Sequence, residues 1–336
     1  DLLVGGVMVI RLVVVLLLLT KQGQIKRSLR RVQSEGLPIA STSSSGDNKG
    51  KHDAATVSDC GGFSFFDDVL GEAGPAIMGV LNVTPDSFSD GGRHLAVQSA
   101  VTRGLEVIEQ GASFVDVGGE STRPGAAPVT TEEELRRVIP VIEALKRQTS
   151  ALISVDTSTA RVMSEAYQAG ADLINDVRAL RCDGALEVCS AMPIPVCLMH
   201  MQGEPGSMQN DPIYEDVVSD VALFLEERIR ICEEAGVDRR RIIIDPGFGF
   251  GKTLMHNLSL LKNLEKFKQL GLPVLVGMSR KSMVGQVLKK PVENRVIGSV
   301  AAAVIAAMNG ASIIRVHDVK QTVDAIKMTR AVMGVN

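Results

Sequence analysis

The chain has 336 residues, of which 45% are hydrophobic and 22% are charged. This length and apolar content are typical of a globular protein with one large core, and they exclude a chain that is disordered throughout. Asp and Glu outnumber Lys and Arg by 39 to 36, which argues against a general nucleic-acid-binding protein, because such proteins need an extended basic face.

The first 60 residues are expected to lie outside the fold. Residues 1–20 are almost wholly apolar apart from Arg11, and a basic stretch follows, as in a membrane anchor or targeting peptide. A span needs about 20 apolar residues and a central Arg costs roughly 2.5–3.5 kcal/mol, so this one is marginal. Residues 41–59 are rich in Ser, Asp and Gly, which is typical of a disordered linker. We therefore predict an extension over 1–60 and one domain over 61–336.

The odd number of cysteines, five, with no C-x-x-C spacing, indicates reduced thiols in a reducing compartment. We expect a cytoplasmic protein that contacts a membrane only if the N-terminal segment is a real anchor.

From Ala76 onward, short apolar runs alternate with longer helical stretches. The runs expected to form strands are 77–81, 113–117, 152–155, 173–174, 196–199, 242–244, 274–276 and 312–314. Eight strands alternating with helices predict an α/β fold, a (β/α)₈ TIM barrel in a single domain. An open doubly wound sheet is the alternative, but it usually has fewer strands.

Several helix ends are predicted from local signals. Thr131 and Glu134 have the spacing of a capping box, and Gly111 and Gly236 are expected to end helices. The Asp211-Pro212 pair predicts the start of a long helix that ends near Ala235.

Polar side chains follow the predicted strands. They are Asn82, Asp156, Asn175, His200, Asp245, Arg315 and His317, with Ser279, Arg280 and Lys281 after the seventh strand. A single Asp or Asn in such a place is more often a turn or helix cap, but barrel active sites lie at the C-terminal ends of strands. The set as a whole predicts one active-site mouth.

The glycine-rich segment 246–253 is similar to a phosphate-binding P-loop. That motif needs a glycine where this chain has Pro246, and no G-x-G-x-x-G is present here. Nucleotide binding is therefore not indicated. The five histidines also lack the spacing of a structural zinc site.

Longer motifs carry a family resemblance. They occupy residues 77–92, 117–125, 154–157, 175–176, 198–203, 245–252, 277–282 and 315–318. In this order they resemble the signatures of dihydropteroate synthases, over about residues 62–334. The resemblance implies condensation of 6-hydroxymethyl-7,8-dihydropterin diphosphate with p-aminobenzoate, which gives 7,8-dihydropteroate and pyrophosphate by a dissociative substitution.

The resemblance also implies roles for individual residues. Asp156, Asn175 and Asp245 would pair with the pterin edge, Lys281 with its acceptor side, and Met199 and Phe250 would pack on its faces. Asn82 would bind Mg²⁺, the expected cofactor, while Arg315, His317 and Arg123 would hold the diphosphate. Thr122, Pro124, Phe88 and Ser279 would hold p-aminobenzoate. The catalytic set is Asp156, Asp245, Lys281, Arg315 and His317, and loops 83–92 and 119–130 are candidate lids.

Two alternatives stay open from the sequence. One is a methyltetrahydrofolate-type methyltransferase, which shares the pocket carboxylates but holds no diphosphate. The other is a pterin-binding protein without activity. The family is commonly dimeric, so we expect a homodimer, and the Ala-rich stretch 299–308 suits either the core or a subunit interface.

Overall fold

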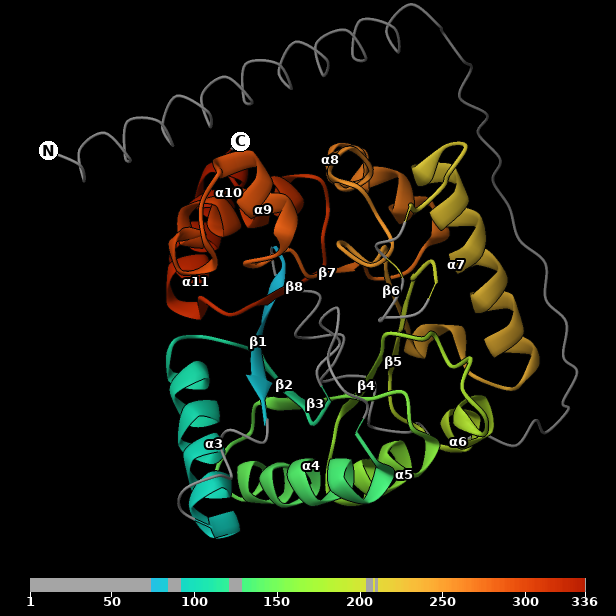
Figure 1. Cartoon of the computed structure of the whole chain (residues 1–336), viewed down its shortest axis with the longest axis vertical. Coiled ribbons are helices and arrows are strands. Elements are labelled where there is room, and N and C mark those ends of the chain that lie inside the picture. Colours follow the sequence, from blue (N-terminus) through green and yellow to red (C-terminus); the bar gives the residue numbers. More distant parts are fainter. Residues whose placement is uncertain (1–73, 84–91, 121–128, 204–207, 209–210, 336) are drawn as a thin grey trace, which may run out of the picture. The chain divides into compact units, whose positions relative to one another are not determined.

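The structure is a computed structural model that describes residues 74–83, 92–120, 129–203, 208 and 211–335, with the side chains of 92–94 left out (Figure 1). The predicted N-terminal extension and its boundary near residue 60 lie outside these residues. Among the helices that are described, none is long and apolar enough to cross a membrane.

Eight parallel strands form the centre of the fold (Figure 1). They are β1 (Ala76–Asn82), β2 (Phe114–Gly118), β3 (Leu152–Asp156), β4 (Leu173–Asp176), β5 (Val196–Met199), β6 (Ile242–Asp245), β7 (Leu275–Val276) and β8 (Ile313–Val316). The sheet runs in the order β6-β5-β4-β3-β2-β1-β8-β7. A parallel bridge from Ile244 to Val274 joins β6 to β7, so the sheet closes as the predicted barrel.

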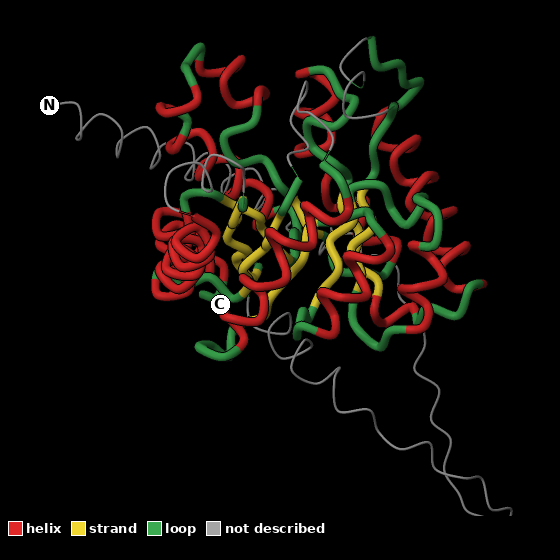
Figure 2. The backbone as a smooth tube through the Cα atoms, turned by 60° about the horizontal axis from the view of Figure 1, so that its bottom comes forward, coloured by secondary structure: helices red, strands yellow, loops and turns green. Residues whose placement is uncertain are grey.

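Helices alternate with the strands along the chain and surround them (Figures 1 and 2). They are α3 (Gly92–Glu109), α4 (Thr131–Lys146), α5 (Ala160–Gln168), α6 (Ala185–Ala191), α7 (Val217–Glu234), α8 (Leu254–Lys262), α9 (Ser282–Leu288), α10 (Val296–Met308) and α11 (Val319–Met333). Short 3₁₀ helices are η2 (Arg239–Arg241), η3 (Leu264–Leu270) and η4 (Val292–Asn294).

One predicted capping box and one predicted helix start are wrong. The N-cap of α4 is Thr130, whose hydroxyl accepts from the amide of Glu133, so Thr131 and Glu134 form no capping box. Glu134 is instead buried and accepts a hydrogen bond from Thr159. Helix α7 begins at Val217 after an Asp216 cap, five residues beyond Asp211-Pro212, because the Asp216 carboxylate accepts from the amide of Ser219.

The two predicted glycine ends are confirmed. Gly111 and Gly236 follow α3 and α7 with φ of 100° and 96°, in the region where glycine has no Cβ penalty.

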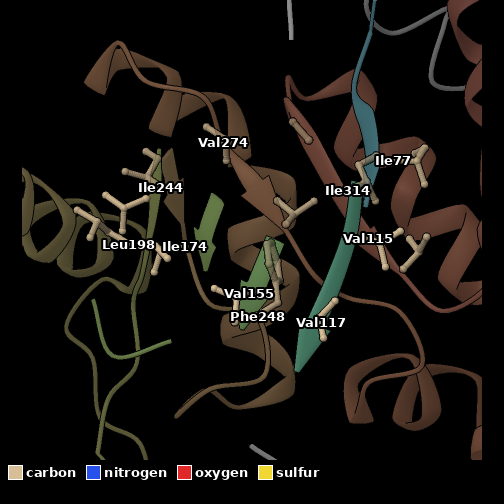
Figure 3. Packing of buried hydrophobic residues seen from close by; sticks show 14 of the residues in the cluster. Ile77, Val115, Val117, Val155, Ile174, Leu198, Ile244, Phe248, Val274 and Ile314 are labelled. Atoms are coloured by element: carbon tan, nitrogen blue, oxygen red, sulfur yellow. The ribbon is translucent and has the colours of Figure 1, made fainter. Parts of the chain in front are cut away.

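The main core lies between the strands and the helices. Alternate strand residues such as Val115, Val117 and Ile314 are buried in it, and Figure 3 shows them clustered around the sheet. Residues of the opposite parity form a second apolar cluster, which fills one end of the barrel interior. Its members are Ala76, Met78, Phe114, Leu152, Leu173, Cys197, Ile243, Leu275 and Ile313. The barrel is therefore packed, and only its other end can hold a ligand.

Candidate active site

The inner face of the barrel changes from apolar to polar along the strands. Two residues beyond an apolar interior residue, the same face carries Asp116 after Phe114, Asn175 after Leu173, Asp245 after Ile243 and Arg315 after Ile313. Asp156 belongs to the same face, since it pairs in register with Asn175. Because side chains in a strand alternate between faces, these groups converge at the C-terminal mouth.

Arg315 lies between two carboxylates. Its Nε donates to Oδ2 of Asp116 at 2.6 Å, and an Nη donates to Oδ2 of Asp156 at 2.7 Å. Burial alone would lower the pKa of Arg315, but the two carboxylates raise it above its usual range. The guanidinium is therefore a fixed cation deep in the site.

The buried acids at the mouth titrate abnormally. Burial raises the pKa of Asp156 to about 7, with Arg315 opposing the rise and Asp116 adding to it. Burial also raises the pKa of Asp245, against the effect of Lys281, and Oδ1 of Asp245 accepts from the amide of Gly247 at 2.7 Å. Perturbed carboxyl groups of this kind cluster at functional sites.

Lys281 supplies the second cation. Its Nζ donates to the carbonyl of Phe248 at 2.5 Å and lies 4.4 Å from the ring centroid of Phe250. Burial lowers the pKa of Lys281 to about 8, although the nearby Asp245 carboxylate opposes this change. The site therefore holds a lysine that can lose its charge near neutral pH.

Asn175 and an apolar wall complete the described part of the site. Nδ2 of Asn175 donates to Asp116 at 3.2 Å. Met199 and Phe250 are both buried in a small apolar cluster, which also contains Val177, Met201 and Met208. The two residues predicted to contact the ring faces thus lie together, beside the polar groups of the same mouth.

The loops after β7 and β8 are tied to each other. Oγ of Ser279 accepts from the amide of His317 at 3.1 Å and lies 3.2 Å from its Nδ1. Arg280, with φ of 59°, forms a two-pronged ion pair with Asp318 and donates its amide to Ser299 at 2.9 Å. Ser279 and Lys281 are therefore held on either side of a left-handed residue.

Other strand-end residues serve the structure. Nδ1 of His200 lies 2.8 Å from Nζ of Lys252, its ring packs on the edge of Phe224, and burial lowers its pKa to about 2. Lys252 also donates to the carbonyls of Gly247 and Phe250, so it fastens the glycine-rich loop from within. His200, expected at the mouth, is thus part of that support.

The same contacts explain why the loop contains glycines. A Cβ on Gly247 would lie 1.8 Å from the carbonyl oxygen of His200, and one on Gly251 would lie 2.3 Å from that of Gln202. The loop resembles a P-loop only because its backbone approaches the end of β5 closely.

Asn82 is exposed at the end of β1. A Cβ on Gly118 would lie 3.7 Å from Oδ1 of Asn82 and 3.6 Å from Cβ of Asp156, so both side chains reach the same mouth. Phe88, Thr122, Arg123 and Pro124 lie outside the described residues, as does most of the two predicted lids.

Proteins of known sequence and structure are similar to this chain. The family described as "Pterin binding enzyme" matches residues 78–317. The dihydropteroate synthase of Escherichia coli (strain K12) is 54% identical over 260 residues, which cover 77% of this chain and 92% of that protein. The chain belongs to the dihydropteroate synthase family of pterin-binding enzymes.

Solved dihydropteroate synthases have the same barrel. The Xanthomonas albilineans dihydropteroate synthase with 4-aminobenzoic acid is 54% identical, with a TM-score of 0.74 over 78% of this chain and 94% of that one. A structure of that enzyme in complex with 7,8-dihydropteroate is 50% identical, with a TM-score of 0.71 over 78% and 95% of the two chains.

Of the site residues predicted from the sequence, Asp156, Asn175, Asp245, Lys281 and Arg315 lie together at the mouth, whereas Asp116 was not predicted. The predicted residues of this dihydropteroate synthase-family chain lie at strand ends, whereas Asp116 lies in mid-strand, within an apolar run. One sequence signal could have revealed it: Asp116 is a lone carboxylate within the apolar run of β2. It lies two residues after Phe114, and therefore on the same, inward face of the strand.

Proposed function

We propose that this site joins the methylene carbon of a 6-hydroxymethyl-7,8-dihydropterin diphosphate to the amine of p-aminobenzoate. The products are 7,8-dihydropteroate and pyrophosphate. The observation that carries the proposal is a single barrel mouth that holds the buried Asn175 and Asp245 together with the half-buried Asp156, Lys281 and Arg315. In it Arg315 is paired with Asp156, and Asn175 is hydrogen-bonded to Asp116. The complexes of the Xanthomonas albilineans enzyme with 4-aminobenzoic acid and with 7,8-dihydropteroate support the same reaction.

The pterin edge fits the buried acceptors. It presents N–H donors beside ring-nitrogen acceptors, and a carboxylate offers only acceptors while an amide offers both. Asp156 and Asp245 accept hydrogen bonds from the ring N–H groups. Asn175 pairs with a position that offers both a donor and an acceptor, and Lys281 donates to the acceptor side of the ring. Met199 and Phe250 contribute an apolar wall for the ring faces.

The diphosphate end lies toward the loops after β1 and β8. His317 and the guanidinium of Arg315 are the cations and donors from β8, with Arg123 assisting from the second loop. The donor set also fits Mg²⁺, because the amide oxygen of Asn82 is a hard ligand at the open mouth, and Mg²⁺ usually keeps several waters and few protein ligands. A bound Mg²⁺ would neutralise charge on the departing pyrophosphate.

Bond breaking precedes bond making. The C–O bond breaks with its electron pair leaving on pyrophosphate, and the positive charge spreads over the dihydropterin ring. Ionised Asp156 and Asp245 stabilise that charge from fixed positions, which is the kind of preorganised electrostatics that lowers barriers most. The amine of p-aminobenzoate then attacks the methylene carbon and loses a proton, so no covalent enzyme intermediate forms.

The second substrate is assigned to the other side of the mouth. Ser279, fixed by His317, is its described contact, and Phe88, Thr122 and Pro124 are the remaining predicted ones. Holding the amine close to the cation shortens the cation's exposure to water.

The identity to a dihydropteroate synthase favours this reaction over the two alternatives. A methyltetrahydrofolate-type methyltransferase has no diphosphate to bind, whereas this chain has Arg315 and His317 at the end of β8.

A homodimer through α10 completes the proposal. This helix carries no charged residue over Val296–Met308, yet Ile297 is 58% exposed and the adjacent Val292 is 44% exposed. An apolar helix face on the surface is typical of a subunit interface. Light scattering of the wild type and of Ile297→Asp tests it, with a dimer expected for the first and a monomer for the second.

Mixing the protein with both substrates tests the reaction. Equimolar pyrophosphate and 7,8-dihydropteroate are expected with Mg²⁺ present, and far less after chelation. Turnover that continues unchanged in chelator would reject the role of Mg²⁺, and absence of both products would reject the function.

A further inference from the structure

Asp116 is a buried carboxylate that takes no direct part in the proposed reaction. It sits in the middle of β2, it is 0% exposed, and it lies one layer deeper in the barrel than Asp156. An isolated carboxylate in such a place is costly to bury unless its charge is paired. The residues that contact Asp116 must therefore include the partners of its charge.

Two residues of the site converge on one oxygen of Asp116. Oδ2 accepts from Nε of Arg315 at 2.6 Å and from Nδ2 of Asn175 at 3.2 Å. These partners come from β8 and β4, on different sides of the barrel. Oδ1 is buried too, and it has no hydrogen-bond partner within the part of the chain that the structure describes.

The contact with Asn175 fixes which way its amide faces. Oδ2 of Asp116 accepts from Arg315, so this oxygen faces Asn175 as an acceptor and the amide turns its NH₂ toward it. One N–H is used there, and the other N–H together with the carbonyl oxygen is left for a ligand. In the flipped orientation two acceptors would face each other, which costs hydrogen-bond energy in a buried site.

The contact with Arg315 fixes the direction of its guanidinium. With Nε held by Asp116, the planar fork extends toward the mouth, where an Nη reaches Asp156 at 2.7 Å. The charges are arranged as a chain from Asp116 through Arg315 to Asp156. Without the charge of Asp116, the guanidinium of Arg315 would no longer be held in one direction. Asp156 would then be the one counterion left to Arg315 of the two described here.

We propose that Asp116 is a positioning residue for the pterin, which sets the amide of Asn175 in the orientation that the ring requires and directs the guanidinium of Arg315 toward the mouth. Asp116 itself contacts neither substrate. It affects pterin recognition through its two hydrogen-bond donors, Asn175 and Arg315. This inference rests on the proposed function, because it assumes that Asn175 reads the pterin.

The first test compares Asp116→Asn with a matched control. Ser154→Ala removes a buried polar atom on the neighbouring strand, directly in register with Asp116, whose hydroxyl has no partner among the described residues. We expect Asp116→Asn to raise the KM for the pterin diphosphate about tenfold, which corresponds to ~1.4 kcal/mol, and to leave the KM for p-aminobenzoate unchanged. Ser154→Ala should change neither. Equal losses for both substrates, or no loss, would overturn the proposal.

The second test asks whether Asp116 acts through Asn175. Pterin binding is measured by calorimetry, with 6-hydroxymethylpterin as the probe, for the wild type, Asp116→Asn, Asn175→Ala and the double variant. If Asp116 positions the amide, Asp116→Asn should cost clearly less affinity in the Asn175→Ala background than in the wild type. Additive losses would reject the coupling. A wild type that does not bind the probe would instead contradict the proposed function.

A further pair of variants covers the case in which Asp116→Asn does not fold. Removing both partners of a buried ion pair is tolerated better than removing one. Asp116→Asn/Arg315→Gln is then compared with Arg315→Gln alone. The double variant should bind the pterin more weakly, because its Asn175 amide is no longer oriented, and equal affinities would count against the proposal.

Discussion

Asp156 and Lys281 are half-buried ionisable residues whose pKa values desolvation moves toward neutrality, to about 7 and about 8. The proposed chemistry needs Asp156 ionised and Lys281 charged. Activity should therefore fall as pH drops through about 7 and again as pH rises through about 8, which makes kcat/KM bell-shaped. Lys281→Met should be less active than the wild type, and its kcat/KM should no longer fall at alkaline pH. A pH series of kcat/KM measures this. An alkaline limb that persists unchanged in this variant would remove Lys281 from the account.

Arg315 and His317 were both assigned to the diphosphate from the sequence, and the structure separates them. Arg315 is bonded to two acids of the pterin side, whereas His317 contacts Ser279. We expect His317→Ala to weaken binding of the pterin diphosphate about tenfold, or ~1.4 kcal/mol, with little effect on the bare hydroxymethyl pterin. Arg315→Ala should weaken both ligands. Calorimetry with the two ligands decides, and loss of the bare pterin in His317→Ala would contradict the assignment.

The predictable residues were those at strand ends. The positions of Asp156, Asn175, Asp245 and Arg315 follow from an apolar run that stops at a polar residue, since parallel strands present their C-terminal ends at one mouth. Which face a residue takes also depends on register, and the sequence could not show that His200 would turn toward Lys252. Asp116 was missed because the prediction considered only the polar residue that ends each apolar run, and Asp116 lies inside one.

At the scale of elements, strands were easier to predict than helix starts. Central strands of a parallel barrel are continuous apolar runs, so their bounds fell within two residues of those observed. The start of α4 depends on whether Thr130 or Thr131 turns its hydroxyl inward to the first amides, and both residues suit a cap. Tertiary contacts of Glu134 decided between them.

The link between the loops after β7 and β8 leads to a prediction about Arg280. Its left-handed backbone strains a non-glycine residue by roughly 1–2 kcal/mol, whereas its side chain pairs with Asp318. If that ion pair positions Lys281 and His317, Arg280→Ala and Arg280→Gly should lose activity to a similar degree, about tenfold or ~1.4 kcal/mol in kcat/KM. Arg280→Gly should nevertheless unfold at the higher temperature of the two. Full activity in the glycine variant would show that only the backbone matters.

At the scale of the whole molecule, the site opposes folding stability. A carboxyl whose pKa is raised from 3.8 unfolded to about 7 folded binds its proton more tightly in the folded state. Its favourable contribution to the free energy of folding is therefore fully present below the unfolded pKa of 3.8 and is lost as the pH rises through the folded pKa of about 7. Asp156→Asn should raise the free energy of unfolding more at about pH 8 than at about pH 4. Urea titrations at the two pH values check this, and a variant less stable than the wild type at both would refute it. Asp116 remains in this variant to pair with Arg315.

The domain boundary is also a property of the whole chain. We propose that residues 61–336 fold and act without the first 60, because the matched family region, 78–317, lies inside them. The sequence predicts this boundary because the Ser-, Asp- and Gly-rich stretch 41–59 carries no apolar pattern that could join the barrel.

The central claim is that buried acids at the barrel mouth read the edge of the pterin. Calorimetric titration of Asp245→Asn with the pterin diphosphate tests it most directly, since the amide keeps the shape of the side chain but puts a donor where an acceptor is needed. An unpaired buried group costs about 1–3 kcal/mol, so the affinity should fall roughly five- to 150-fold relative to the wild type. An Asp245→Asn variant that folds and binds the pterin diphosphate as tightly as the wild type would contradict the account.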